Sequence, residues 1–288
     1  MRKKKRICRK IIKIVLISVI IFLIIFPFYS MLVLSVIPEE VYIQQGFVII
    51  PNKFTWDSFL YVFSNKALWS AFGISILVTF LGVAFNLLLT ITAAYVLTVD
   101  FPGKKFYVIL IFIALFFDGG LIANYLVIKD LGLINSIFSM ILPVGLNISF
   151  LLLLTKAFRK IPKSVIESAK MDGANDLQIL FKFFIPMAMP MISAIAMYYA
   201  VERWNEWYLG MLYMNKMGFQ PLQLFLRNII SNSSPITATE IMQNMGVMPF
   251  SLGIKMACTI ITIIPILIIF PFMQKKFLNN LSSGSEKE

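Results

Sequence analysis

The sequence predicts an all-α integral membrane protein with six transmembrane helices and both termini in the cytoplasm. Of its 288 residues, 59% are hydrophobic and only 14% are charged, and the mean hydropathy is +0.85. Soluble domains are roughly 45–50% apolar and about 25% charged. The apolar residues here form runs long enough to cross a hydrocarbon core of about 30 Å, and basic residues gather between those runs.

The amino terminus joins a basic head to a long apolar run. Eight Lys and Arg side chains lie in "MRKKKRICRKIIK", residues 1–13, and residues 14–37 carry no charge. The apolar region of a signal peptide is only about 7–15 residues long and precedes an A-x-A-like site, which does not follow here. We therefore expect a retained first helix with a cytoplasmic head.

The later spans are predicted from the same alternation of apolar runs and charged breaks. Residues 38–66 are mixed polar and aromatic, as expected of an exposed interfacial loop. The twelve residues before Asp118 are too few to cross the membrane, so we expect the third helix to continue through or past Gly119-Gly120. The remaining spans are predicted between Lys66 and Asp100, between Lys105 and Lys129, at 136–154, at 187–213 and at 252–272, followed by a cytoplasmic tail at 274–288.

The positive charge is distributed as the orientation requires. Most of the 26 Lys and Arg residues fall in the head, in the turn 100–105, in residues 156–182 and in the tail. Basic residues favour cytoplasmic segments, which places these four on one side. The net charge of +12 then follows from topology and from anionic lipid, and we expect no nucleic-acid partner.

Few residues of this chain suit catalysis. It has no histidine, no GxxxxGK[ST] phosphate-binding loop and no metal-ligand spacing. Its two cysteines, Cys8 in the head and Cys258 in an apolar run, suggest no disulfide framework. We therefore expect no catalytic residue, metal or cofactor in this chain.

A polar, proline-punctuated segment interrupts the apolar chain at residues 161–190. Pro162 and the S-x-x-E pattern of Ser164 and Glu167 both predict a helix start, about two residues apart. Asp172-Gly173 predicts a turn. A second helix is predicted to carry one apolar face, made by Leu177, Leu180, Phe181 and Phe184. A cytosolic partner could push on such a hairpin and so move the membrane helices joined to it.

This segment resembles the EAA motif of ABC-importer permeases. In "ESAKMDGANDLQILFKFFIPMAMP" the matching residues are Glu167, Ala169, Asp172, Gly173, Ala174, Ile185 and Pro186. Ser168 replaces an alanine, and Met187 departs from the usual proline. The stretches "FTWDSF", "FFDGGLIANYLVIKDLGLIN", "YYAVERWNEWY" and "GIKMACTIITIIPILIIFPFMQKKF" resemble the carbohydrate-uptake branch, most of all the carboxyl-side permease of maltose-type or lipoprotein-associated oligosaccharide importers.

The resemblance implies a type I ABC-importer permease fold over residues 14–273, in the bacterial cytoplasmic membrane. It implies that residues 162–185, named here the coupling hairpin, dock on an ATPase subunit that holds ATP and Mg. The coupling residues would be Glu167, Ser168, Ala169, Asp172, Gly173, Ala174 and Pro186. The implied partners are a second permease, two ATPases and an extracytoplasmic solute-binding protein. Without the resemblance, the hairpin would be only an interfacial amphipathic connection.

Ionisable residues inside spans are costly and need a reason. Arg203 either lines the solute path or pairs with Glu206, and the nearby tryptophans either stack on sugar or form an interfacial belt. Asp118 either lines the path or marks a helix break, and Lys255 either lines it or snorkels to the interface. The candidate path residues are Arg203, Trp204, Asn205, Trp207, Asp118 and Lys255.

Together these features predict a permease subunit of an ATP-driven, binding-protein-dependent oligosaccharide importer. A path-lining Arg203 would favour an acidic, uronate-containing solute. The loop 214–251 is long enough to be functional and, by the resemblance, reaches toward the binding protein. The alternatives are an ABC permease for another solute, an ion-coupled secondary transporter, which often shows internal repeats not evident here, and a non-transporting scaffold.

Overall fold

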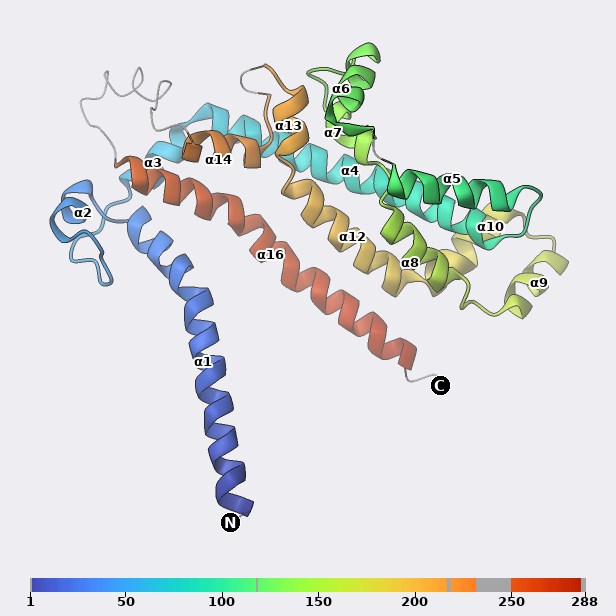
Figure 1. The fold of residues 1–288 in the computed structure, drawn as a ribbon, viewed down its shortest axis with the longest axis horizontal. Helices are drawn as coiled ribbons and strands as arrows, with labels where there is room; N and C mark the ends of the chain where they lie inside the picture. Colours follow the sequence, from blue (N-terminus) through green and yellow to red (C-terminus); the bar gives the residue numbers. More distant parts are fainter. Residues whose placement is uncertain (1, 118, 217–218, 232–249, 286–288) are drawn as a thin grey trace. The chain divides into compact units, whose positions relative to one another are not determined.

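The structure is a computed structural model that describes residues 2–117, 119–216, 219–231 and 250–285 (Figure 1). Within these ranges every regular element is helical. The elements are α1 (Arg2–Ser35), α2 (Glu39–Gln45), α3 (Asp57–Ser64), α4 (Lys66–Thr98), α5 (Lys104–Phe116), α6 (Gly120–Asp130), α7 (Phe138–Ile141), η1 (Leu142–Val144), α8 (Ile148–Phe158), α9 (Lys163–Met171), α10 (Asp176–Ile179), the π-helical turn η2 (Leu180–Phe184), α11 (Ile185–Met187), α12 (Met189–Trp204), α13 (Tyr208–Tyr213), α14 (Leu222–Ser231) and α16 (Ser251–Ser285).

The chain forms two compact units, which are described separately. The first unit comprises residues 1–68 and 226–264, and the second comprises residues 69–225 and 265–288. In the first unit a small core joins the end of α1 to α2 and to the start of α16. Its buried members are Val33, Ile37, Val41, Val48 and Phe250.

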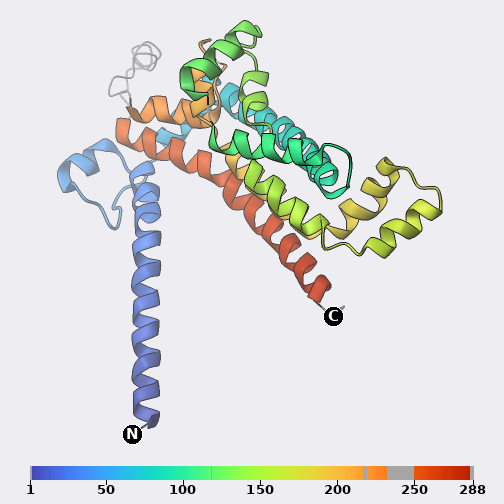
Figure 2. The same cartoon turned by 45° about the vertical axis from the view of Figure 1, so that its right-hand side comes forward.

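The second unit is organised around α4, α8 and α12, and α8 lies beside α12 in both ribbon views (Figures 1 and 2). Apolar side chains from these helices and from the coupling hairpin form one continuous core. Within the bilayer these contacts stabilise the unit through van der Waals packing, because lipid chains are as apolar as the side chains and burial there removes no surface from water. The buried members of this core are Ala94, Leu97, Leu151, Leu154, Phe158, Ala169, Ile179, Leu180, Phe184, Ala188, Ile192, Ile195 and Tyr199.

A buried polar network crosses the same core. The Thr90 hydroxyl lies 2.8 Å from the Tyr199 hydroxyl and donates to the Asn86 carbonyl at 2.7 Å. The Tyr199 hydroxyl accepts the Asn147 amide N–H at 3.1 Å, and Asn86 Nδ2 donates to the Val144 carbonyl at 2.8 Å. Polar groups at membrane depth need such internal partners because hydrocarbon offers none. The network thus fixes α4 and α12 to the bend that precedes α8.

Three helices are long and apolar enough to cross a membrane: Lys10–Ser35, Lys66–Thr98 and Ser251–Ile269. Two bent pairs also qualify if each counts as one span, Phe138–Val144 with Ile148–Phe158 at 56° and Asp176–Met187 with Met189–Trp204 at 82°. Length and composition therefore support three to five spans among the described residues. The number six stays a prediction.

The predicted third and fifth helices are each broken. The third helix does not run unbroken through Gly119-Gly120, because α5 ends at Phe116 and α6 begins at Gly120, whose φ of 77° lies outside the right-handed helical region. The helical chain continues past the glycines as α6, and the break lies where the sequence offered one for Asp118. The predicted helix 187–213 is interrupted at 205–207, where the Glu206 carboxylate accepts the Leu209 amide at 2.9 Å and so caps α13. Conversely, the last helix continues to Ser285, across most of the tail expected at 274–288.

The hydroxyl of Tyr199 provides a test of the polar network. We expect Tyr199→Phe to lower the free energy of unfolding by about 1 kcal/mol, because it removes the acceptor of the Asn147 amide and the partner of Thr90. For a chain of this size that corresponds to a fall in Tm of roughly 2–4 °C. Tyr198→Phe is the matched control, since Tyr198 is the exposed neighbour on the same helix. Equal Tm values for the two variants, measured on the purified membrane protein, would contradict a structural role for the network.

Candidate functional site

The coupling hairpin consists of two short helices joined by a glycine turn. Pro162 directly precedes α9, but the predicted cap by Ser164 is not formed. Gly173 adopts φ 79° in the turn, and its amide donates to the Lys170 carbonyl at 3.0 Å. The helix α10 begins with a capping box, in which Asn175 and Gln178 exchange side-chain and backbone hydrogen bonds at 2.8 and 3.0 Å. Asn175 and Gln178 stand at N-cap and N3 spacing, a signal that was readable in the sequence.

The predicted coupling residues divide between two surfaces. Glu167, Ser168, Asp172 and Gly173 are exposed, whereas Ala169 is buried in the core of the second unit. Ala174 packs against the same core, and its amide donates to the Ala169 carbonyl at 3.0 Å. One face of the motif is thus anchored to the membrane helices and the other is available to a partner. Pro186 lies in α11, where the hairpin joins α12.

The single apolar face predicted for the second helix is wrong. Leu180 and Phe184 are buried, but Leu177 and Phe181 are about two-thirds exposed. The cause is that Ile179 also turns inward, and η2 adds a π-helical turn that departs from the 3.6-residue period. Three apolar side chains therefore lie on the outside of the hairpin: Leu177, Phe181 and Met171, which is 88% exposed.

Rings and one polar contact attach the hairpin to the membrane helices. The Phe184 ring lies edge-on to Tyr95 of α4 and to Phe158 of α8, with ring centroids 5.1 Å apart in each pair. The Tyr95 hydroxyl donates to an Asp176 carboxylate oxygen at 3.0 Å. A displacement of the hairpin must therefore move α4 and α8, or break these contacts.

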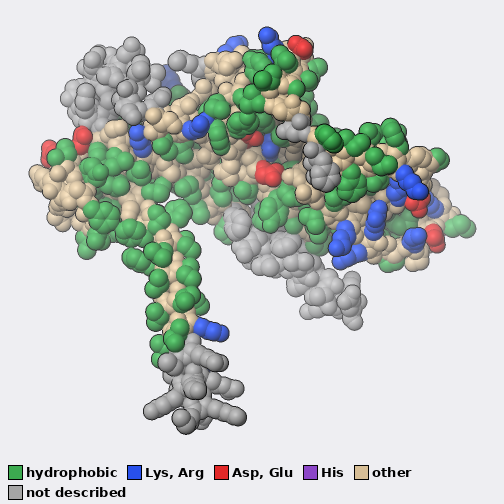
Figure 3. Space-filling model, in the orientation of Figure 1, with side chains coloured by type: hydrophobic (Ala, Val, Ile, Leu, Met, Phe, Trp, Pro, Cys, Tyr) green, Lys and Arg blue, Asp and Glu red, His purple; other side chains and the backbone are tan. Residues whose placement is uncertain are grey.

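Basic side chains gather at the hairpin end of the second unit, where Figure 3 shows Lys and Arg over α9 and α10. Lys104 pairs with Asp100 at 2.9 Å in the turn before α5. This hydrogen bond and charge hold the pKa of the exposed Asp100 carboxyl below its ordinary value, with smaller contributions from Lys163 and Arg159. The turn 100–105 and the hairpin thus lie at the same end of the unit, as the basic pattern predicts.

The guanidinium of Arg203 is buried at the end of α12, only 6% exposed. Its Nη1 donates to the Met140 carbonyl of α7 at 3.2 Å, and its Nη2 lies 3.8 Å from a carboxylate oxygen of Glu206. Its stem crosses α4 at Gly82, where a Cβ atom would fall 2.9 Å from Arg203 Cδ. The structure therefore contains the ion pair that the sequence offered as one of two explanations for this residue. The path-lining explanation stays a prediction.

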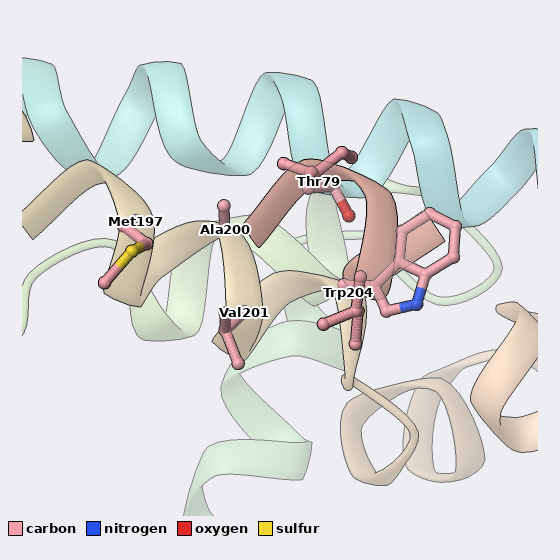
Figure 4. A pocket seen from close by; sticks show the side chains of 7 residues that line it. Thr79, Met197, Ala200, Val201 and Trp204 are labelled. Atoms are coloured by element: carbon pink, nitrogen blue, oxygen red, sulfur yellow. The ribbon is translucent and has the colours of Figure 1, made fainter. Parts of the chain in front are cut away.

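The other aromatic and amide candidates lie around this cluster. Trp204 is buried, with its ring edge-on to Phe72 at 5.8 Å, whereas Trp207 is about one-third exposed. Gln223 donates to the Asn205 side-chain oxygen at 3.2 Å. Trp204, Thr79 and three further residues of α12 line a cavity of about 50 Å³, together with Ile266 and Ile269 (Figure 4). Binding pockets for small molecules are roughly 300–1,000 Å³, so this cavity is too small for a sugar.

The two remaining path candidates are Lys255 and Asp118. Lys255 of α16, in the first unit, donates to the Ile230 carbonyl at 3.2 Å, in the last turn of α14. Asp118 lies outside the described residues. Residues 232–249, which make up most of the loop 214–251 predicted to reach a binding protein, also lie outside them. Among the described residues no group of three His, Cys, Asp or Glu side chains could hold a metal ion.

Sequence comparison relates the chain to known transport proteins. Residues 105–282 match the family model described as "Binding-protein-dependent transport system inner membrane component". The chain is 36% identical to the polygalacturonan/rhamnogalacturonan transport system permease protein YtcP of Bacillus subtilis, over 91% of this chain and 92% of that protein. It is also 36% identical to protein LplC of the same organism, over 91% of this chain and 89% of LplC.

Comparison with solved structures also relates the chain to a transport protein. A chain of a bacterial ABC transporter involved in the import of the acidic polysaccharide alginate superposes with a TM-score of 0.85 at 27% identity, covering 92% of this chain and 95% of that chain. The family model spans more than half of the sequence, and YtcP matches nearly all of it. The chain therefore belongs to the family of inner-membrane components of binding-protein-dependent transport systems.

Proposed function

We propose that this chain is a permease subunit of an ATP-driven importer that takes up acidic, uronate-containing oligosaccharides. The observation that carries the proposal is its likeness, over more than nine-tenths of its length, to YtcP and to the alginate importer. The names of both proteins refer to polymers of acidic sugars. Family membership also argues against the secondary transporter and the scaffold that the sequence left open.

The proposed topology has six spans with both termini in the cytoplasm. The broken pairs α5–α6 and α12–α13 would each lie within one span, and the bend at η1 within another. Support comes from the basic side chains that gather at the hairpin end of the second unit, because such residues favour the cytoplasmic side.

The proposed mechanism couples the hairpin to a separate ATPase subunit, which would hold ATP and Mg. Exposed Glu167, Asp172 and Gly173 would contact that subunit, together with the apolar side chains of Leu177 and Phe181. Buried Ala169, Ile179 and Phe184 would pass its displacement to α4, α8 and α12. Closure of the ATPase pair would then move these helices and open the path outward.

A second permease subunit would complete the solute path. This path would run between the two permeases. An extracytoplasmic binding protein would deliver the solute.

The solute class can be tested in proteoliposomes that contain this chain with its second permease, its ATPases and its binding protein. We expect oligogalacturonides to stimulate ATP hydrolysis and neutral oligosaccharides of the same length to have no effect. Stimulation by the neutral sugars alone would remove the acidic part of the proposal. If no saccharide stimulates hydrolysis, the chain transports another class of solute.

The glycine turn of the hairpin can be tested with two substitutions that differ in backbone preference. A Cβ atom at Gly173 meets nothing within 4 Å, but φ 79° strains a β-branched residue and suits asparagine. We expect Gly173→Val to weaken docking of the ATPase about tenfold, the equivalent of roughly 1.4 kcal/mol, and Gly173→Asn to preserve it. Copurification of the ATPase and solute-stimulated hydrolysis report the effect. Normal coupling in Gly173→Val would contradict docking through this turn.

The two explanations of Arg203 predict different effects of substitution on Tm and on solute-stimulated ATP hydrolysis. If Arg203 acts through its buried pair, Arg203→Gln and Glu206→Gln should lower Tm and reduce transport of every solute to a similar extent, because each leaves a buried charge unpaired. If Arg203 meets the solute carboxylate, Arg203→Gln should abolish stimulation by oligogalacturonides while Glu206→Gln leaves it in place. We expect the first pattern, from the contacts of the guanidinium. Thermal unfolding and stimulated ATP hydrolysis of both variants distinguish the two.

A further inference from the structure

The segment between α2 and α3 carries an unusual set of exposed apolar side chains. In residues 46–56, named here the return loop, Phe47, Ile49, Ile50, Phe54 and Trp56 are all exposed. Val48 alone turns inward and joins the core of the first unit. An exposed apolar cluster of this kind in a soluble loop would mark a contact surface.

The return loop folds back along α1 toward its apolar middle. The Tyr29 hydroxyl donates to the Ile49 carbonyl at 2.5 Å, and the rings of Phe26 and Phe47 lie 6.0 Å apart. Near the end of the return loop, the Thr55 amide donates to the Val36 carbonyl, just after α1, at 2.8 Å. The loop therefore leaves the end of α1, returns to the level of residues 26–29, and comes back to the level of residue 36.

The depth of these contacts follows from helix geometry. If Lys13 marks the cytoplasmic edge of the hydrocarbon, a core of about 30 Å takes about 20 residues at roughly 1.5 Å each and ends near Val33. Tyr29 and Phe26 then lie about 6 and 10 Å inside the outer edge of an untilted helix, and less for a tilted one. Segments that lie in the membrane interface bury their apolar side to about 5–10 Å. The contacts thus hold Phe47 and Ile49 at interfacial depth.

We propose that the return loop is embedded in the outer leaflet of the bilayer and anchors the first unit to the lipid interface. Its apolar side chains continue the apolar surface of α1, whose side chains from Ile11 to Ile25 are exposed. Both appear as hydrophobic surface in Figure 3. The span in α1 is apolar, with a mean hydropathy of 3.0, and the loop contacts it at interfacial depth, so lipid is the occupant to which we assign the loop. Exposed Lys53 can extend its ammonium group to lipid phosphates.

The chemistry of the loop fits the boundary of the leaflet, not its centre. Irregular backbone is not tolerated in the hydrocarbon interior, because its N–H and C=O groups lack partners there. At the boundary, water and headgroups can satisfy them, and the Tyr29 hydroxyl already satisfies the Ile49 carbonyl. Aromatic residues such as Trp56 also favour this region. The proposal is independent of the transported solute and of the ATPase.

Spin labels at single cysteines test the proposal in the assembled transporter, placed in nanodiscs of phosphatidylethanolamine and phosphatidylglycerol. The background carries Cys8→Ser and Cys258→Ala, and the labelled positions are Ile50→Cys, Leu23→Cys on the exposed surface of α1, and Glu40→Cys in the first turn of α2. The measurement is the accessibility of each label to oxygen, which partitions into lipid, and to a water-soluble nickel chelate.

We expect the label at position 50 to show a ratio of oxygen to nickel accessibility several-fold above that at position 40, with a calculated depth between those at positions 40 and 23. A ratio equal to that at position 40 would place the loop in water and overturn the proposal. Low accessibility to both reagents would also overturn it, because a protein partner would then cover the loop. Normal incorporation of each labelled variant into the transporter controls for misfolding.

Discussion

The packing of Ile179, Leu180 and Phe184 against α4, α8 and α12 is the interaction on which the second unit depends. These three side chains come from a polar hairpin, yet they belong to the same core as the membrane helices. A tightly packed interior transmits displacement because it has few voids into which side chains can yield. The exposed surface of the hairpin can therefore vary in sequence while its buried surface keeps a fixed relation to the helices. This division explains why the motif contains both small buried residues and exposed charged ones.

A second constraint is the absence of water in the bilayer. Asn86, Thr90 and Tyr199 are fully buried, and the side chain of each has a hydrogen bond to a residue of another helix. Their targets include the Val144 carbonyl and the Asn147 amide, which lie where the chain bends between η1 and α8. A bend frees backbone groups that a straight helix would satisfy itself. Polar side chains from adjacent helices thus make the bend stable at membrane depth, and the bend in turn fixes their positions.

Much of this arrangement was predictable from the sequence, and the errors have physical causes. The apolar runs and basic segments predict membrane helices and a basic end, and the Asp172-Gly173 pair predicts the turn of the hairpin. The break between α5 and α6 was one of two explanations offered for Asp118, whereas the break at 205–207 was missed, because hydropathy measures transfer to lipid and says little about backbone dihedrals. The inward turn of Ile179 and the π-helical turn were missed because a 3.6-residue period was assumed. The partners of Arg203 come from α4 and α7, distant in sequence, and only Glu206 was near enough to propose.

The breaks in the helices also determine how a displacement of the hairpin can reach the opposite end of the second unit. The hairpin core includes Ile192, Ile195 and Tyr199 of α12, and α12 ends at the Arg203 cluster, where Glu206 caps the next helix. A displacement that enters through Phe184 can therefore travel along one rigid helix for about four turns. At its far end the buried ion pair and the Met140 carbonyl join α12 to α13 and α7, so these short helices would move with it. Short helices separated by breaks can change orientation without unfolding a long span. The broken helices are therefore where a displacement at the hairpin end can become a change in shape at the other end of the second unit.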